Sequence, residues 1–410
     1  MYTFGVQVCF VVEAVIGEFS KKLNRRDMLR GSFLAGGVLL TGLGEARWPE
    51  PPERQGATPL LTGKMLGVVD FTEEAPVPMS EAFGEELDGR LYSDLSGLSA
   101  ENPIIPVDRF YIRTRASNLL DSHKEWLVHM SGGNAKPLDL TIKDLRGIAR
   151  SLGVHLMECA GNVRSVHFGM ISVASWTGVP LSEILEKANF ISDGKRVLIS
   201  GFDSYTTKSA SSIPGASWVF TGEQLKEARA FLATEMNGSA LTRDHGAPVR
   251  LVVPGWYGCT CIKWVNEISL VDDTVPATSQ MQEYASRTTQ NGVPQLAREY
   301  NPAIIEQAAM PIRVEKWVYG EKIKYRVVGI LWGGAVPVKK LQIRFNPEED
   351  YVDVENYEEA ANDPWNFWTH TWVPSQPGTY MIRLHVADPQ VTARRLEAGY
   401  YMRTVEISEV

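Results

Sequence analysis

From residue 310 onward the chain alternates hydrophobic and polar positions in short stretches that are separated by turn residues. A period of two is typical of β-strands that bury one face. The stretches are IRVEKWVY, KIKYRVVGILW, KKLQIRF, FWTHTWVP, GTYMIRLHVAD and YYMRTVEIS. This pattern predicts that residues 310–410 form an all-β sandwich of immunoglobulin type, with dimerisation as its simplest use. The segment lacks the cysteine pair of antibody domains, so the prediction concerns the architecture alone.

Residues 60–273 combine extended and helical patterns, which predicts a mixed α/β domain and an α+β fold class for the whole chain. The runs predicted as strands are 107–115, 196–203 and 248–255. The segments predicted as helices are 141–150 and 176–189. Thr141 and Pro180 stand near the helix starts, where a capping side chain is useful and a missing N–H is harmless. Residues 274–309 lack periodicity and are predicted to form a long connection.

Residues 1–46 have the pattern of a targeting segment. Arg25 and Arg26 precede the weakly apolar stretch 31–44, as in a twin-arginine export signal. That stretch is well short of the ~20 residues needed to cross a bilayer, so no stable membrane insertion is expected. The pattern predicts a periplasmic protein exported in the folded state, with the Pro-rich segment 47–59 as a linker. The alternative is a cytosolic chain whose arginine pair arises by chance.

Composition narrows the classes of protein to which the chain can belong. With 410 residues, 44% of them hydrophobic and 22% charged, the chain resembles an ordinary two-domain globular protein. A formal net charge of −8 argues against nucleic acid and anionic membranes as partners. Four cysteines are too few for a disulfide framework, and the sequence has no CxxCH haem-attachment motif.

Cys159 lies in the run HLMECAGNVRS, between acidic Glu158 and small Ala160. Small neighbours leave space for a large group to approach the sulfur, and Arg164 nearby favours the thiolate. Thiolates bind soft transition metals well. The alternative is a buried structural cysteine, which packs as a small hydrophobic residue.

Other separated segments carry polar residues that a plain core would not need. Arg113 and Arg115 end the run 107–115, Asp203 follows a predicted strand, and the segment 243–264 has several cations and glycines. Cations that converge with exposed backbone N–H groups make a site for a phosphate or another oxyanion. The alternative is that these residues form salt bridges in the core or at the surface.

Taken together, these motifs resemble the sulfite oxidase family of molybdopterin enzymes. The family's cysteine motif stands here as ECAGN (158–162), and its pterin-binding motif as RDHGAPVR (243–250), followed by Gly258, Lys263 and Trp264. The resemblance extends from about Phe110 to the C-terminus, because the β-rich tail also resembles the dimerisation domain of the family.

The resemblance implies a role for each matching residue. Cys159 would bind the molybdenum. Arg113 and Arg164 would line an anion pocket above the metal, and Asp203 would accept hydrogen bonds from ring nitrogens of the pterin. Tyr284 matches the family's active-site tyrosine only loosely and can equally be a packing residue. The other residues assigned to the cofactor are Arg115, His245, Arg250, Gly258, Cys261, Ile262 and Lys263.

The function implied by the resemblance is the oxidation of sulfite or a related small sulfur oxyanion at a molybdenum–molybdopterin cofactor. Without a haem motif in this chain, the electrons would pass to an external acceptor such as a cytochrome c. A homodimer is expected from the tail. The alternatives are a sulfoxide reductase of the methionine-sulfoxide-repair type and, in a different class, a cofactor-free surface binding protein.

The sequence also departs from the family pattern near the expected substrate. Thr114 and Arg115 follow Arg113 where sulfite oxidisers commonly have Asn and His, and the stretch after Arg164 lacks their tryptophan. Cys259 and Cys261 stand where small residues are usual. Such a pair can bind metal or become oxidised, or it can provide two small packing groups. These differences bear on the substrate more than on the cofactor.

Overall fold

The computed structural model describes residues 63–72, 77–122, 125–133, 137–189, 195–203, 215–357 and 364–410. The predicted export signal and linker, residues 1–59, therefore lie outside the described residues, as does the segment 204–214 that follows Asp203. The described residues belong to one compact unit that starts at Thr62. Within them, no helix is long and apolar enough to cross a membrane.

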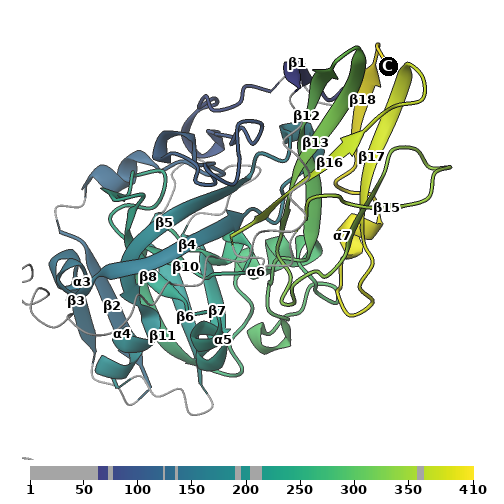
Figure 1. Cartoon of the computed structure of the whole chain (residues 1–410). Coiled ribbons are helices and arrows are strands. Elements are labelled where there is room, and N and C mark those ends of the chain that lie inside the picture. Colours follow the sequence, from purple (N-terminus) through teal and green to yellow (C-terminus); the bar gives the residue numbers. More distant parts are fainter. Residues whose placement is uncertain are drawn as a thin grey trace, which may run out of the picture. The chain divides into compact units, whose positions relative to one another are not determined.

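Residues 127–272 form two five-stranded sheets, with short helices beside them (Figure 1). This mixture confirms the mixed α/β character predicted for this part of the chain. The first sheet has the order β10-β8-β5-β4, and β9 pairs with β8. Its strands are β4 (Arg150–Glu158), β5 (Ile171–Pro180), β8 (Phe231–Met236), β9 (Ser239–Ala240) and β10 (Arg250–Val252).

The second sheet has the order β3-β2-β11-β6-β7, in which β2 and β11 are parallel and the other pairs are antiparallel. Its strands are β2 (Leu127–Gly132), β3 (Leu138–Thr141), β6 (Lys195–Gly201), β7 (Ser217–Thr221) and β11 (Val265–Asp272). The largest fully buried side chains of this part of the unit include Trp176, Trp218 and Phe220, so a contiguous aromatic core supports both sheets.

The helices are short, and their caps follow from the sequence. The Thr141 and Thr221 side chains accept hydrogen bonds from the N3 amides of α3 and α5, which forms a capping box at each start. The α-helices are α3 (Ile142–Ile148), α4 (Leu181–Lys187), α5 (Gly222–Glu227), α6 (Ser279–Tyr284) and α7 (Arg394–Glu397). The 3-10 helices are η2 (Glu86–Asp88), η3 (Val107–Arg109), η4 (Asn118–Ser122), η5 (Arg164–Val166), η6 (Gly258–Thr260), η7 (Ala285–Arg287) and η8 (Ala297–Glu299).

All six alternating stretches of the C-terminal part form strands, as their periodicity predicts. They are β12 (Ala308–Tyr319), β13 (Lys322–Trp332), β14 (Leu341–Arg344), β16 (Asn366–Trp372), β17 (Gly378–Val386) and β18 (Arg403–Ile407). With β1 (Lys64–Val69) and β15 (Val352–Asp353) they form two antiparallel four-stranded sheets, β1-β12-β13-β16 and β15-β14-β17-β18. The two sheets lie against each other through β12 and β17 and through β1 and β18 (Figure 1).

Some predicted elements are wrong in type or extent. Residues 107–115 form η3 and a single bridge between Leu91 and Ile112 instead of a strand. Residues 176–180 complete β5, and α4 starts only at Leu181, because Pro180 disfavours a helical conformation of the preceding Val179. Of the predicted strand 248–255, only Arg250–Val252 is paired as β10.

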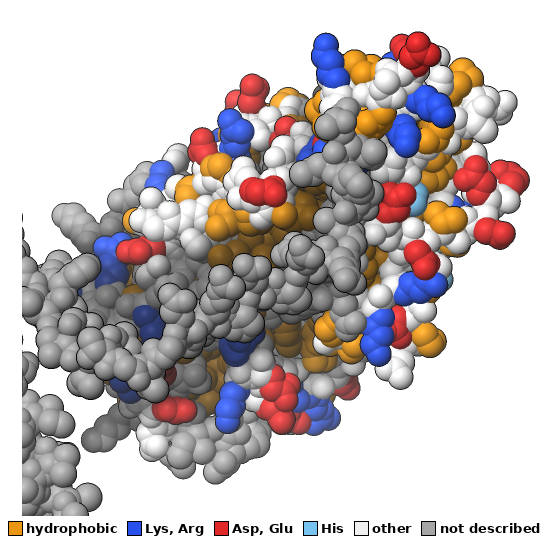
Figure 2. Space-filling view, in the orientation of Figure 1, with side chains coloured by type: hydrophobic (Ala, Val, Ile, Leu, Met, Phe, Trp, Pro, Cys, Tyr) orange, Lys and Arg blue, Asp and Glu red, His pale blue; other side chains and the backbone are white. Residues whose placement is uncertain are grey.

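On the face of the molecule that Figure 2 shows, basic and acidic side chains are interspersed.

Candidate functional site

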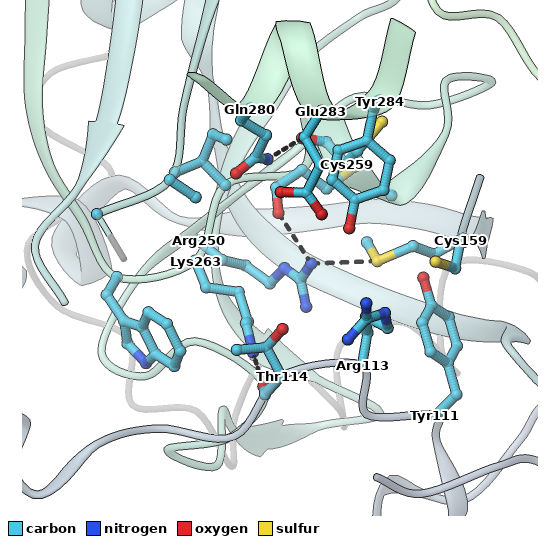
Figure 3. A pocket seen from close by; sticks show the side chains of 17 residues that line it. Tyr111, Arg113, Thr114, Cys159, Arg250, Cys259, Lys263, Gln280, Glu283 and Tyr284 are labelled. Carbon is cyan, nitrogen blue, oxygen red and sulfur yellow. Dashed lines mark hydrogen bonds between the residues drawn. The ribbon is translucent and has the colours of Figure 1, made fainter. Parts of the chain in front are cut away.

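A pocket lies where β4, η6, α6 and the segment after η3 come together (Figure 3). It unites many of the residues that the sequence singled out from distant segments. Those residues are Arg113, Cys159, Arg250, Gly258, Cys261, Ile262, Lys263 and Tyr284. The wall also includes Tyr111, Thr114, Met157, Cys259, Trp264, Gln280 and Glu283.

Cys159 is the first residue after β4, and the loop that follows is tightly held. The Cys159 amide donates to the Met170 carbonyl at 2.9 Å, and the Asn162 amide donates to the Cys159 carbonyl at 2.9 Å. The Gly161 amide donates to the Cys159 Sγ at 3.4 Å. Burial raises the pKa of the thiol, whereas the Arg113 charge, the Gly161 N–H and the Arg287 charge act in the opposite direction. The sulfur is therefore fixed at the pocket wall with cations nearby.

Glu158, at the end of β4, connects the cysteine loop to the C-terminal sheets. Its buried carboxylate accepts a hydrogen bond from Trp332 Nε1 at 2.8 Å and one from Asn162 Nδ2 at 3.3 Å. Burial raises the pKa of Glu158 to about 7, while these two donors work against that shift. Because Trp332 ends β13, the position of the Cys159 loop depends on a strand that lies far along the chain.

Arg250 is a fully buried cation at the start of β10. It donates to the carbonyls of His245 and Cys261 at 3.0 and 3.2 Å, and to Met157 Sδ at 3.1 Å. Its buried Nε has no hydrogen-bond partner among the described residues. Burial lowers the pKa of Arg250 from its usual value. A buried cation that is satisfied only by neutral acceptors favours an anionic ligand beside it.

Lys263 provides a second cation next to Arg250. Its Nζ donates to the carbonyls of Thr114 and Asp244, the latter at 2.9 Å, and lies 4.3 Å from the centre of the Trp264 ring. Burial and then the Arg250 charge lower the pKa of Lys263 to about 7. An anion bound at this wall would relieve the repulsion between the two cations.

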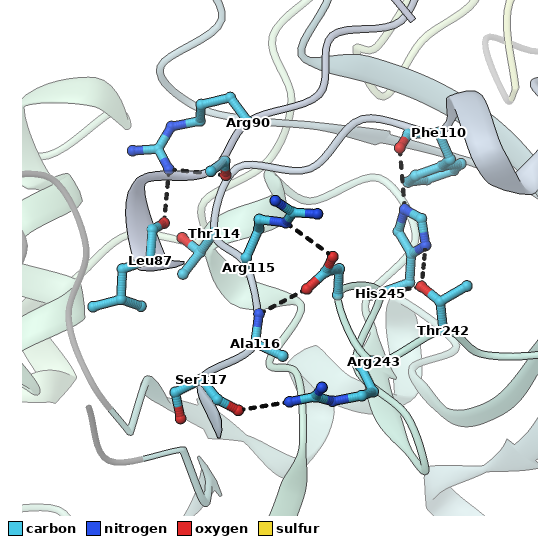
Figure 4. Close-up of polar contacts among 12 residues, drawn as sticks. Leu87, Arg90, Phe110, Thr114, Arg115, Ala116, Ser117, Thr242, Arg243 and His245 are labelled. Carbon is cyan, nitrogen blue, oxygen red and sulfur yellow. Dashed lines mark hydrogen bonds and ion pairs between the residues drawn. The ribbon is translucent and has the colours of Figure 1, made fainter. Parts of the chain in front are cut away.

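His245 is not among the described residues that line the pocket, and Figure 4 shows its contacts with Phe110 and Thr242. The Phe110 carbonyl accepts from Nε2 at 3.0 Å, so that nitrogen carries the proton and Nδ1 accepts from the Thr242 hydroxyl at 2.7 Å. Burial lowers the pKa of His245 to about 4. The neutral ring therefore ties the segment before Arg113 to the loop between β9 and β10.

Arg115 and Asp203 hold the same segment from its other end, and neither is among the lining residues described. Arg115 Nε pairs with Asp244 Oδ2 at 3.2 Å, and the Ala116 amide donates to Asp244 Oδ1 at 2.8 Å (Figure 4). The buried Asp203 carboxylate accepts from the Ser117 hydroxyl and, at 3.1 Å, from the Ser117 amide. In this structure both residues support the wall on which Arg113 and Thr114 stand.

The Arg164 guanidinium contacts the C-terminal part of the chain. Arg164 lies in η5, and its Nη2 donates to the Tyr400 carbonyl at 3.4 Å, on the C-terminal side of the cysteine loop. It is not among the described residues that line the pocket. The geometry thus differs from the expectation that Arg164 lines an anion pocket beside Arg113. η5 ends at His167, in a left-handed conformation with φ 52°, and the next residue, Phe168, packs against Tyr400 and Tyr401.

Tyr284 lines the pocket from α6, within the segment 274–309 that was predicted to be a connection carrying this candidate residue. In Figure 3 its hydroxyl and the Arg113 guanidinium point toward the same space, next to Cys159. Burial raises the pKa of Tyr284 above its usual value, so the hydroxyl stays protonated and can donate. Glu283, also at the wall, has its pKa raised by burial against the effect of Arg113 and Arg287.

Cys259 and Cys261 are free thiols that share this pocket with Cys159. Burial raises the pKa of both thiols, and Cys261 Sγ accepts from the Val253 amide at 3.4 Å. Within the described residues, no group of three or more His, Cys, Asp or Glu side chains is arranged to hold a metal ion.

Tyr111, Thr114, Met157, Gln280 and Glu283 are wall residues to which the sequence analysis assigned no role. Tyr111 and Thr114 are neighbours of Arg113 and could have been found by adjacency. Gln280 and Glu283 lie in α6, where nothing in the local pattern marks them.

About half of the chain is similar to known molybdopterin-binding proteins. Residues 116–279 match the family model described as the oxidoreductase molybdopterin binding domain. The chain is 33% identical to the mitochondrial sulfite oxidase of Homo sapiens over 204 residues, which are 46% of this chain and 36% of that protein. It is 29% identical to the sulfite oxidase of Gallus gallus over 203 residues, 46% of this chain and 44% of that protein. The match thus spans less than half the length of these relatives.

A solved structure resembles a larger share of the chain. The crystal structure of the sulfane dehydrogenase SoxCD from Paracoccus pantotrophus aligns with a TM-score of 0.59 and covers 88% of this chain and 96% of that chain. The sequence identity is 19%, so this likeness concerns the fold.

Proposed function

Because the chain belongs to the sulfite oxidase family of molybdopterin-dependent oxidoreductases, we propose that it oxidises sulfite or a related small sulfur oxyanion. Electrons would pass to an external acceptor such as a cytochrome c. The observation that carries the proposal is the convergence of Cys159 with Arg113, Arg250 and Lys263 in one pocket. A thiol suited to a soft metal and cations suited to phosphate and oxyanions come together from three separate segments.

The chemistry of the pocket fits a molybdopterin. Cys159 would hold the metal through its sulfur, and Arg250, whose buried Nε lacks a partner among the described residues, would meet the phosphate together with Lys263. Backbone groups at Gly258, Cys261 and Ile262 would contact the pterin. A side chain at 258 would remove this space, since a Cβ there would lie 2.7 Å from Tyr111 Oη and 3.2 Å from the Glu158 carbonyl. The bound cofactor supplies two-electron oxygen-atom-transfer chemistry.

The protein's own residues bring the substrate to that chemistry and orient it. The Arg113 guanidinium, at the pocket wall beside Cys159, attracts an anion and lowers the cost of moving it out of water. The Tyr284 hydroxyl, kept protonated by its raised pKa, donates a hydrogen bond to an oxygen of the anion. Neutral His245 and the Arg115–Asp244 pair keep the Arg113 segment in place.

Three further features belong to the proposal. The two C-terminal four-stranded sheets would form an immunoglobulin-like module that mediates a homodimer, for which their antiparallel pairing is the support. The Arg25-Arg26 motif supports export to the periplasm by the twin-arginine route. The absence of a CxxCH motif from the sequence supports an acceptor on another protein.

The test is metal and pterin analysis combined with an activity assay on the wild type and on Cys159→Ser. We expect about one molybdenum and one pterin per wild-type chain, and sulfite-dependent reduction of ferricyanide or cytochrome c. Cys159→Ser should abolish turnover, because a hydroxyl is a poor ligand for a soft metal. Arg298→Met, at an exposed arginine on η8 that is not among the described lining residues, is the control and should keep its molybdenum and its turnover.

Each other outcome points elsewhere. Wild-type protein without molybdenum would contradict the proposal and favour a cofactor-free binding protein. Molybdenum together with reduction of methionine sulfoxide, but no oxidation of sulfite, would favour the reductase. Full activity of Cys159→Ser would mean that the sulfur is not the metal ligand.

A further inference from the structure

We propose that Arg287, in η7, which lies beside the Cys159 loop outside the lining residues of the pocket, binds the sulfur oxyanion together with Arg113. This inference rests on the proposed function and specifies how its anion is recognised. It assigns to the predicted connection 274–309 a role in substrate binding that local sequence pattern does not reveal.

The position of Arg287 follows from its contact with the cysteine loop. A Cβ built on Gly161 would lie 3.2 Å from Arg287 Nη1 and 3.8 Å from Cys159 Sγ. These two distances limit the separation between the guanidinium nitrogen and the sulfur to about 7 Å. An oxyanion placed over the sulfur can therefore contact this guanidinium directly or through one water. Glycine at 161 leaves open the space that the guanidinium uses.

Arg287 is held in this place from two sides. Its guanidinium carbon lies 5.4 Å from the centre of the Tyr284 ring, an arrangement in which the cation is attracted to the aromatic face. Its carbonyl accepts from Arg395 Nη2 at 2.7 Å, and the same nitrogen donates to the Ala160 carbonyl at 3.4 Å. One guanidinium of α7 thus joins the backbone of Arg287 to the loop that carries Cys159.

The arginines around the cysteine loop point to the same pairing. Arg113 lines the pocket together with Cys159, and Arg287 Nη1 lies beside Gly161 of the same loop. Arg164, in contrast, donates to the Tyr400 carbonyl. The side chain of Arg287 is exposed, so it stands at the mouth of the site, where an entering anion still has its water shell. A cation there steers the anion and then shares its charge with Arg113.

The test compares Arg287→Met and Arg287→Lys with Arg298→Met. Arg298 is an exposed arginine on η8 that pairs with Asp273 and serves as the matched control. Removing one partly exposed charged contact should raise the KM for sulfite about tenfold and change kcat less than twofold. The inhibition constant of sulfate, a non-reacting anion, should rise by the same factor. Arg287→Lys should recover part of the loss, and Arg298→Met should match the wild type.

Several readouts separate this role from a structural one. Molybdenum content and melting temperature should be unchanged in Arg287→Met, and the decrease of kcat/KM with added salt should be shallower than in the wild type. Unchanged KM and sulfate inhibition in Arg287→Met would overturn the inference. So would a larger effect from Arg164→Met than from Arg287→Met, in a variant that keeps its melting temperature.

Failure of the proposed function would be recognised separately. A wild-type protein that does not turn over sulfite contradicts the proposed function. Sulfate binding, measured by calorimetry on the wild type and on Arg287→Met, then still tests the anion site. Binding at least about fivefold weaker in the variant would support the site, and equal binding would refute it.

Discussion

Acidification should destabilise this protein through His245, and His245→Gln should remove that part of the pH dependence. The ring donates from Nε2 to the Phe110 carbonyl and accepts at Nδ1 from Thr242, so both nitrogens are satisfied only in the neutral form. A proton on Nδ1 would turn the acceptor into a donor and place a charge in a buried position.

The magnitude follows from the pKa of His245, which is lowered from 6.5 to about 4. As the pH falls, the unfolded chain takes up a proton on this ring before the folded chain does. The stability linked to the neutral ring is therefore present above pH 6.5 and is lost as the pH falls toward 4. With about 1.4 kcal/mol for each pKa unit, the full loss is about 3 kcal/mol, of which about 2 kcal/mol falls between pH 7 and pH 5.

The assay is urea unfolding at pH 7 and pH 5, followed by tryptophan fluorescence, on the wild type and on His245→Gln. The glutamine amide can still donate to the Phe110 carbonyl but does not titrate, so the variant should lose about 2 kcal/mol less than the wild type over this interval. His129→Gln, at an exposed histidine on β2, is the control for loss of a ring. If the wild type and His245→Gln lose equal free energy, the buried neutral ring is the wrong description of this wall.

Two further substitutions test the supports of the cysteine loop. Trp332→Phe leaves the buried Glu158 carboxylate without the indole N–H that donates to it at 2.8 Å. The free energy of unfolding, measured by urea titration, should fall by about 1.5–3 kcal/mol. An unchanged urea midpoint would show that this hydrogen bond does not stabilise the fold. Gly258→Ala forces a Cβ to within 2.7 Å of Tyr111 Oη and should lower both the molybdenum content and, by about 1–3 kcal/mol, the stability. Gly147→Ala, at a glycine with open space around it, should leave both unchanged or add slightly to the stability, and an equal loss in both variants would contradict the argument from contact.

The sequence predicts the C-terminal strands best because their physical signal is local. In β14, β16, β17 and β18 every second side chain is buried, so the alternation alone identifies these strands, whereas β12 and β13 are buried over longer runs. The run 107–115 was predicted as a strand because its residues are strand-forming. Its backbone groups instead pair with groups outside a β-sheet; the Phe110 carbonyl, for example, accepts from His245. β5 was misjudged at its end because a strand that is buried on nearly all sides has no alternation to read.

The sequence predicts which segments form the candidate site, but it does not predict which of their side chains face the pocket. The motifs around Cys159 and Arg250 do meet in one pocket. Whether an arginine beside them faces that pocket depends on partners far away in sequence. The Arg164 guanidinium donates to the Tyr400 carbonyl, and the Arg287 carbonyl accepts from Arg395. No spacing rule in one sequence encodes such pairings, and a connection without periodicity gives no reason to look for a functional cation.

The short strand β1 has a consequence for how the chain can be shortened. It pairs along β12, and beyond it Phe71 bridges Val405 while the Thr72 amide donates to the Thr404 carbonyl at 2.9 Å. Residues 64–72 thereby cover β12 and β18, each of which would otherwise lie at the edge of its C-terminal sheet. Any cleavage that removes residues up to 72 would bare a row of unpaired peptide groups on β12, which is the kind of surface on which neighbouring molecules aggregate.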